Sequence, residues 1–88
     1  MNINKKPSFF KDIKKITDPT LKERVEQAIL SVENTQSLKD IPDMKKLRGY
    51  KIYYRIKVGA YRIGVSIESE TVTFFVFMHR KDIYKFFP

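Results

Sequence analysis

The sequence predicts an α+β fold, in which two N-terminal helices pack on one face of a small antiparallel β-sheet. Two amphipathic segments with helical spacing lie before residue 34, and three runs of alternating residues follow between residues 50 and 78. Of the 88 residues, 42% are hydrophobic and 14% are aromatic, which is enough for one core. We therefore expect a single domain over residues 1–88.

The N-terminal part of the chain predicts a short strand and two helices. Ile3 is the apolar side chain of residues 2–6, so a strand there would be short and lie at a sheet edge. Ser8 is placed to cap a first helix, and Asp18 or Thr17 to cap a second helix with a proline in its first turn. Apolar residues recur along the second helix at helical spacing: Leu21, Val25, Ala28, Ile29 and Val32.

Three consecutive strands follow, and their turns set the pairing. The apolar or aromatic positions of the three runs are Tyr50, Ile52, Tyr54, Ile56 and Val58, then Tyr61, Ile63, Val65 and Ile67, then Val72, Phe74, Val76 and Met78. Residues 59–60 suit a type II′ hairpin turn because the glycine comes first. Counting from this turn places Lys57 opposite Arg62 and Arg55 opposite Gly64.

The second turn extends the map of the face that points away from the helices. With residues 69–70 as the turn, Gly64 faces Phe75 and Arg62 faces Phe77. We therefore expect this open face to carry the cations of the first hairpin together, with Phe77 beside Arg62.

The positive charge of the chain is concentrated in its second half. The formal net charge is +8; residues 1–43 hold 8 Lys or Arg against 7 Asp or Glu, whereas residues 44–88 hold 10 against 3. A positive field on one element attracts a polyanion, and RNA, DNA or an acidic protein are the ordinary candidates.

Composition argues against several other kinds of site. The chain has no cysteine and a single histidine, which excludes disulfides and leaves no credible zinc site. A glycine-rich phosphate loop, a paired-carboxylate arrangement and a nucleophilic serine with its partners are all missing. The longest apolar run, residues 74–78, is too short to cross a bilayer. We expect a cytoplasmic protein with no cofactor and no membrane partner.

The cations of the open face have the chemistry for RNA cleavage by the ribose 2′-hydroxyl. Arg62 and Arg55 are expected to hold the phosphate, because a guanidinium stays charged and donates parallel hydrogen bonds. Arginine is a poor base, so Lys57 is a candidate for removing the hydroxyl proton. His79 and Tyr84 are further candidates for proton transfer. The residues alone leave open a face that binds without cutting, or one that is merely solvated.

A second set of residues is expected to contact RNA without reacting: Lys45, Lys46, Arg48, Lys51, Phe77 and Lys81. The basic residues before the sheet fit a solvated approach equally well, and Phe77 would either stack on a base or pack under the tail. Lys51 is expected in the first strand, opposite Glu68. Residues 80–88 are too apolar for a free tail, so we expect them to fold back over part of the sheet and bring Tyr84 near the cations, or to form part of a surface for another protein.

Three segments of the chain resemble the RelE/ParE superfamily of bacterial toxin–antitoxin toxins. They are Lys46-Leu47-Arg48-Gly49, Tyr54-Arg55-Ile56-Lys57-Val58-Gly59-Ala60-Tyr61-Arg62-Ile63 and His79-Arg80-Lys81-Asp82-Ile83-Tyr84. Residues 8–16 also resemble the first helix of that family, so the resemblance covers essentially the whole chain.

The resemblance implies an activity and partners. RelE-type members are mRNA interferases that cut mRNA in the ribosomal A site, and each is held inactive by an antitoxin encoded beside it. By position, their basic active site with its C-terminal tyrosine or histidine implies Lys57, Arg62, Arg80 and Tyr84 in this chain. Arg55 stands where some members have lysine, which shifts the expected base to Lys57 or Tyr84. The resemblance thus implies a metal-independent endoribonuclease whose partners are an acidic antitoxin, the ribosome and mRNA.

Two other functions remain open at this point. A ParE-like toxin shares the fold but acts on DNA gyrase and lacks the basic catalytic set, so the presence of that set argues against it. A non-catalytic RNA-binding module would bind phosphate with a steep salt dependence and would not cleave.

Overall fold

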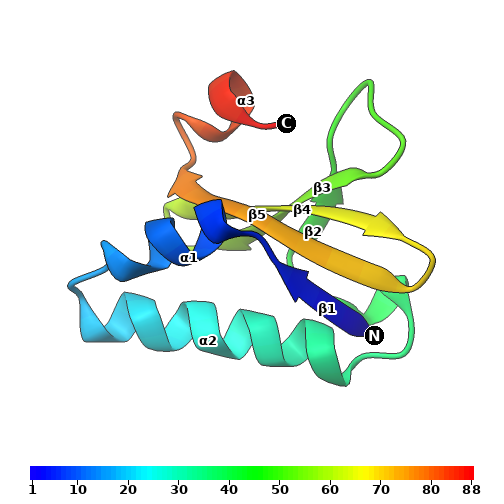
Figure 1. Cartoon of the computed structure of the whole chain (residues 1–88), viewed down its shortest axis with the longest axis horizontal. Coiled ribbons are helices and arrows are strands. Elements are labelled where there is room, and N and C mark those ends of the chain that lie inside the picture. Colours follow the sequence, from blue (N-terminus) through cyan, green and yellow to red (C-terminus); the bar gives the residue numbers. More distant parts are fainter.

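A five-stranded sheet lies between two helices on one face and the C-terminal end of the chain on the other (Figure 1). The structure is a computed structural model that describes residues 1–88. In chain order the elements are β1 (Asn2–Lys5), α1 (Pro7–Lys14), α2 (Pro19–Asn34), a 3₁₀ turn (Leu38–Asp40), β2 (Met44–Lys46), β3 (Tyr53–Val58), β4 (Tyr61–Glu68), β5 (Thr71–His79) and α3 (Ile83–Phe86). The predicted α+β class, with two N-terminal helices on one face, is confirmed.

The two N-terminal helices form where the sequence predicted, with one difference at a cap. α2 begins after Asp18, whose carboxylate accepts a hydrogen bond from the Thr20 amide at 3.0 Å. α1 begins after Lys6 rather than after Ser8. The Ser8 hydroxyl donates instead to the carbonyl oxygen of Phe75 in β5, at 2.6 Å, so this side chain joins the helix to the sheet.

The main core lies between these helices and the sheet. Its buried members are Phe9, Val25, Val32, Ile41, Ile56, Val58, Ile63, Val65, Val72, Phe74 and Phe77. The rings of Phe9 in α1 and Phe74 in β5 pack at 5.2 Å between centroids. Val25 and Val32 lie seven residues apart on α2 and are almost fully buried, as the helical spacing predicted.

The strands are ordered β1-β5-β4-β3-β2, and the sheet is mixed because β1 runs parallel to β5. β1 is the short edge strand that the sequence predicted. Beyond the end of β1, residues at and in α1 form hydrogen bonds with the edge of β5. The Lys6 amide donates to the Phe74 carbonyl at 2.9 Å, and the Asp12 carboxylate accepts from the Phe77 amide at 3.0 Å. These bonds satisfy backbone groups that an open edge would leave unpaired.

The hairpin of β3 and β4 has the predicted register. Lys57 pairs with Arg62, and Arg55 pairs with Gly64. The backbone φ is +59° at Gly59 and is not positive at the following residue, as a type II′ turn requires.

The first long strand is shorter than the sequence predicted. β3 begins at Tyr53, and residues 47–52 form a turn and a bend instead. Gly49, with a φ of +85°, turns the chain there, and the buried Leu47 holds this loop against the C-terminal segment. Lys51 therefore lies exposed in the bend, and its predicted pairing opposite Glu68 is wrong.

A β-bulge in β5 changes the predicted pairing with β4. Val65 pairs with Phe74 whereas Gly64 pairs with Val76, so Phe75 is an extra residue on β5. The predicted pairing of Gly64 with Phe75 is wrong for this reason. Beyond the bulge, every side chain of β5 lies on the opposite face from the one that simple alternation predicted.

Among the side chains that the bulge moves to the other face, Phe77 matters most for the predicted site. Arg62 pairs with Met78 and not with Phe77. Phe77 turns toward the helices, where it is 7% exposed and belongs to the main core. The prediction that Phe77 lies on the open face and binds RNA is wrong, because a ring buried there cannot stack on a base.

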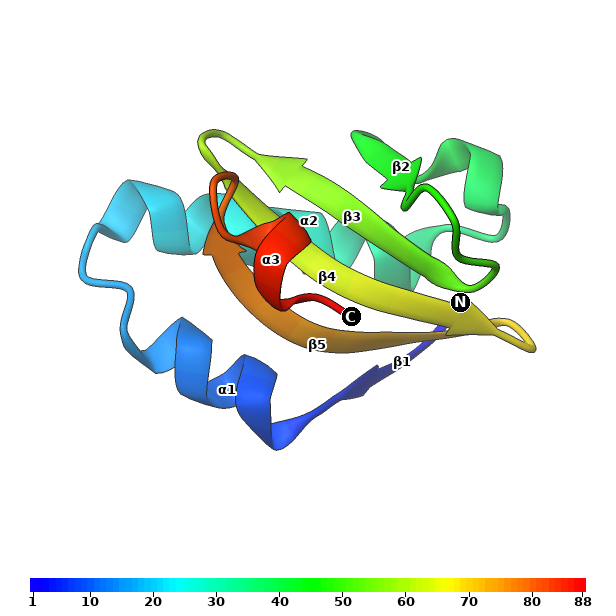
Figure 2. The ribbon, with the colours of Figure 1, turned by 90° about the horizontal axis from the view of Figure 1, so that it is seen from above.

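The C-terminal segment folds back over the face opposite the helices, as predicted. Figure 2 looks onto this face, with α3 over β4 and β5. Leu47, Ile83 and Phe87 form a second buried cluster there, and Tyr53, Phe75, Val76 and Met78 pack against it. None of the helices combines the length and apolar character that crossing a bilayer requires.

Candidate functional site

Four basic residues meet on the face of the sheet away from α1 and α2. Lys45 pairs with Arg55 across β2 and β3, and Lys57 pairs with Arg62 across β3 and β4. Paired residues share a face, and Arg55 and Lys57 are two apart on one strand, so all four point the same way. We call Lys45, Arg55, Lys57 and Arg62 the cation cluster. The sequence predicted the meeting of the last three.

Arg55 is held by the backbone of the turn before β2. Its Nη1 donates to the carbonyl oxygen of Asp43 at 3.1 Å. Asp43 has a φ of +61°, and its carbonyl also accepts from the Lys57 amide at 3.0 Å. The Nε of Arg55 is buried and has no hydrogen-bond partner, so the guanidinium keeps a donor that the protein does not satisfy.

Arg62 is held in a similar way by the hairpin turn. Its Nη1 donates to the carbonyl oxygens of Gly59 at 2.9 Å and Tyr61 at 2.8 Å. Both bonds use one nitrogen, so Nε and Nη2 remain as donors for an anion. The two arginines of the cluster are thus fixed by main-chain carbonyls and not by carboxylates, which leaves their positive charge uncompensated at those contacts.

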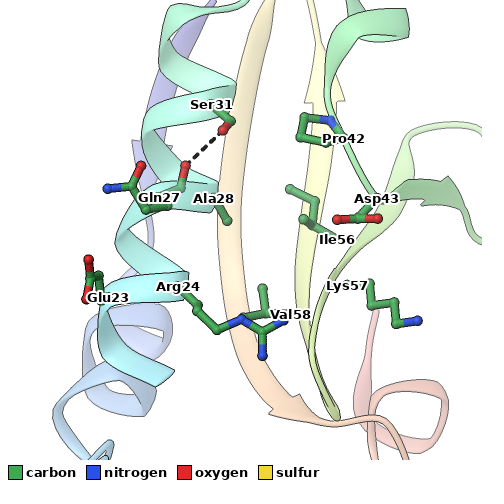
Figure 3. A pocket seen from close by; sticks show the side chains of 10 residues that line it. All are labelled: Glu23, Arg24, Gln27, Ala28, Ser31, Pro42, Asp43, Ile56, Lys57 and Val58. Atoms are coloured by element: carbon green, nitrogen blue, oxygen red, sulfur yellow. Dashed lines mark hydrogen bonds between the residues drawn. The ribbon is translucent and has the colours of Figure 1, made fainter. Parts of the chain in front are cut away.

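Lys57 differs from the two arginines because its side chain is exposed. It lies at the rim of a cleft of about 320 Å³ between α2 and β3. Figure 3 shows Arg24 reaching from α2 toward Val58, while the amino group of Lys57 points away from α2. Lys57 therefore belongs to the cation cluster and Arg24 to the helix side of the sheet.

Arg24 is a cation that sequence analysis missed. A Cβ on Gly59 would lie 2.8 Å from its Nη1, so the glycine leaves room for this guanidinium against the hairpin turn. Asp43, whose carbonyl holds Arg55, was missed as well. Neither had a signal in the sequence, because Arg24 is one of two basic residues on a charged helix and Asp43 acts through its backbone.

The residues after β5 are brought to the same hairpin turn. The Arg80 amide donates to the Ala60 carbonyl at 2.8 Å, so exposed Arg80 and Lys81 lie at the end of the sheet that carries Arg62. His79 pairs with Tyr61, on the helix side of the sheet, and its Nδ1 accepts from the Lys81 amide at 3.1 Å. The structure therefore does not bring His79 onto the face of the cation cluster.

The remaining predicted residues divide between faces and loops. Lys46 pairs with Tyr54 and points to the helix side, whereas Arg48 is exposed in the loop that follows. Tyr84 lies on α3, above the open face, and is 65% exposed. A phenol hydroxyl there is free to meet a ligand. No group of three or more His, Cys, Asp or Glu side chains is arranged to hold a metal ion.

Comparison with known proteins places this geometry in a family. Residues 3–84 match the family model described as the ParE toxin of the type II toxin–antitoxin system parDE. Toxin RelE3 of Methanocaldococcus jannaschii is 42% identical over 82 residues, which are 92% of each chain. The chain belongs to the RelE/ParE superfamily of toxins.

Solved structures agree with this membership. The RelB-RelE antitoxin-toxin complex from Methanococcus jannaschii contains a chain that matches this toxin with a TM-score of 0.80 and 38% identity, covering 97% of this toxin and 99% of that chain. A YoeB dimer from Staphylococcus aureus matches with a TM-score of 0.73 at 18% identity, over 91% and 97% of the two chains. The second likeness supports the fold alone. This superfamily toxin is therefore of RelE type by its similarity to RelE3.

Proposed function

We propose that this toxin is a ribosome-dependent mRNA interferase, an endoribonuclease that cuts mRNA in the ribosomal A site and so inhibits translation. The observation that carries the proposal is the cation cluster, in which Arg55, Lys57 and Arg62 share one face of two neighbouring strands. Like charges side by side cost stability, so a row of them without compensation marks a site for a polyanion. Similarity to the relative named RelE3 supports the same class of activity.

The proposed reaction is attack of a ribose 2′-oxygen on the adjacent phosphorus. The new bond joins the 2′-oxygen to phosphorus, and the bond from phosphorus to the 5′-oxygen of the next nucleotide breaks. One proton leaves the 2′-hydroxyl and one is delivered to the 5′-oxygen, so the products are a 2′,3′-cyclic phosphate and a 5′-hydroxyl. The step consumes no co-reactant, and we assign it to side chains of this protein, without a metal or cofactor.

The arginines of the cluster are assigned to the phosphate. Arg62 keeps Nε and Nη2 free, and Arg55 keeps Nη2 free because its bond to the Asp43 carbonyl uses Nη1. Donors already fixed by backbone carbonyls need little rearrangement when charge develops on the phosphate oxygens, which is the condition for strong transition-state stabilisation. Arg80, tied to the same hairpin turn, adds positive charge at this end of the sheet.

Proton transfer is assigned to Lys57 and Tyr84. Lys57 is exposed on the face of the cluster, and the Tyr84 hydroxyl is exposed on α3 over the same face. One of them takes the proton of the 2′-hydroxyl and the other serves the leaving oxygen. His79 is the weaker candidate, because it pairs with Tyr61 on the helix side.

The proposed partners are an acidic antitoxin, the ribosome and mRNA. The relative from Methanococcus jannaschii was solved as a RelB-RelE complex, which supports an antitoxin for this toxin too. The excess of cations in residues 44–88, 10 Lys or Arg against 3 Asp or Glu, suits both an acidic protein and RNA. Ribosomes place this activity in the cytoplasm.

The test is to add the purified toxin to a reconstituted translation reaction and map the mRNA ends. The proposal expects cuts within codons at the A site, only while ribosomes translate, leaving 2′,3′-cyclic phosphate and 5′-hydroxyl ends. Intact mRNA would overturn it, and so would 3′-hydroxyl and 5′-phosphate ends, which indicate hydrolysis by an activated water.

DNA gyrase is the target of the second candidate function. The specific observation in its favour is that the matching family model is described as a ParE toxin. The 42% identity to RelE3 and the cation cluster weigh against it. Growth arrest with intact mRNA and accumulated gyrase–DNA breaks would support the gyrase function. Salt-sensitive RNA binding without any cuts would support a non-catalytic RNA-binding module.

A further inference from the structure

The short helix α3 is anchored to the sheet by residues on both sides of Tyr84. Ile83 is fully buried and Phe87 is 6% exposed, whereas Tyr84 and Phe86 are 65% and 66% exposed. A single helical turn of this length is not stable by itself in water. The two buried side chains must therefore fix where α3 lies and which way Tyr84 points.

Phe87 is seated in a notch that exists because residue 64 is glycine. A Cβ added to Gly64 would lie 2.7 Å from Cδ2 and 2.8 Å from Cε2 of the Phe87 ring, and 2.8 Å from Cγ2 of Val76. The φ of Gly64 is not positive, so the backbone conformation does not demand glycine there. Glycine is required at position 64 because the Phe87 ring packs so closely against it.

Aromatic side chains frame the notch and orient the ring. The ring of Tyr53, on β3, meets that of Phe87 edge-on, with centroids 5.5 Å apart. The ring of Phe75, on β5, has its centroid 5.8 Å from that of Phe87. Phe75 is the extra residue of the β5 bulge, which lies beside Gly64. The bulge and the glycine thus build one receptacle for one side chain.

This receptacle adjoins the cation cluster. Gly64 is the direct cross-strand partner of Arg55, so the anchor of α3 sits one strand from a proposed phosphate ligand. We propose that Phe87 and Gly64 are positioning residues: the ring in its notch holds α3 so that the Tyr84 hydroxyl stands at a fixed place beside the cation cluster. The proposal rests on the proposed function, in which Tyr84 transfers a proton.

The decisive variant is Gly64→Ala, whose methyl group displaces Phe87 from the sheet. We expect single-turnover mRNA cleavage on the ribosome to slow by about 100-fold, because an error of about 1 Å in a reacting group costs this much. Affinity for the ribosome should be unchanged, because the cations that bind RNA are untouched. The amides of Lys85, Phe86 and Phe87, which donate to the carbonyl oxygens of Asp82 or Ile83, should lose their protection from hydrogen exchange.

Two double variants separate positioning from a general effect on the sheet. Gly64→Ala with Phe87→Leu removes ring atoms from the clash and should recover about tenfold of the lost rate. Gly64→Ala with Val76→Ala removes only the other contact and should recover nothing. Phe87→Ala, which leaves the sheet intact, should reproduce both the slow cleavage and the fast exchange even if Gly64→Ala fails to fold.

The outcomes distinguish this proposal from the proposed function. A wild-type protein that does not cleave mRNA would end the proposed function, and with it any role of the anchor in catalysis. If the wild type cleaves mRNA, and Phe87→Ala cleaves at the full rate although its α3 amides have lost their protection, the positioning role of Phe87 is overturned and the proposed function stands. Unchanged protection of these amides in both Gly64→Ala and Phe87→Ala would overturn the anchor itself.

Discussion

The two faces of the sheet are covered in very different ways. On one face α1 and α2 bury a core of 11 side chains, and Phe74, Ile63 and Val65 are fully inaccessible. On the other face a cluster of only three buried residues lies under a single-turn helix, next to a row of cations. The comparison teaches that stability comes mainly from the first face, so the second face can keep a row of charges that a buried core would not tolerate.

The largest expected effect is on the helix-covered face. Phe74→Ala removes a fully buried ring that packs 5.2 Å from Phe9. We expect the free energy of unfolding to fall by about 3–5 kcal/mol, a large part of the total for a small domain. Urea unfolding followed by circular dichroism measures it. A loss below about 1 kcal/mol would mean that the main core does not dominate stability.

A smaller effect is expected where α1 meets the edge of β5. Asp12→Ala removes the acceptor for the Phe77 amide, and an unpaired backbone donor costs about 1–3 kcal/mol. Asp12→Asn is the matched control, because its amide oxygen still accepts and should restore most of the stability. Equal unfolding midpoints for the alanine and asparagine variants would show that this hydrogen bond contributes little to the free energy of unfolding.

The smallest effect is expected on the cationic face and has the opposite sign. Lys57→Gln removes a like charge directly across from Arg62 and should stabilise the protein by about 0.2–1 kcal/mol. The gain should shrink as salt rises, since salt screens exposed charges. Thermal unfolding at two salt concentrations checks this, with Lys57→Arg as the control that keeps the charge. A destabilised Lys57→Gln protein would contradict the claim that like charges on the cationic face cost stability.

The hairpin of the site could be predicted from sequence because local rules fix it. A glycine at position 59 selects the turn, and the turn then sets the pairing of Lys57 with Arg62. The cap at Asp18 was predictable for the same reason, since it depends on a few neighbouring residues.

The register beyond the bulge could not be predicted in this way. Residues 74–78 are apolar at every position, so alternation does not say which side chains face the core. Packing decides instead: Phe77 enters the main core, and Phe75 joins Phe87 on the other face. The role of Asp43 was equally hidden, because it holds Arg55 through a carbonyl that every residue possesses.

The measurement that tests the central claim most directly is mRNA cleavage by Arg62→Ala in a translation reaction, beside Lys22→Ala. Both variants lose one positive charge. Lys22, however, is exposed on α2, which covers the face of the sheet opposite the cation cluster. The account predicts that Arg62→Ala slows cleavage by about 100-fold to 1,000-fold, as loss of one preorganised donor does, while it still folds and binds antitoxin. Lys22→Ala should cleave like the wild type. Cleavage by Arg62→Ala at the wild-type rate would contradict the account.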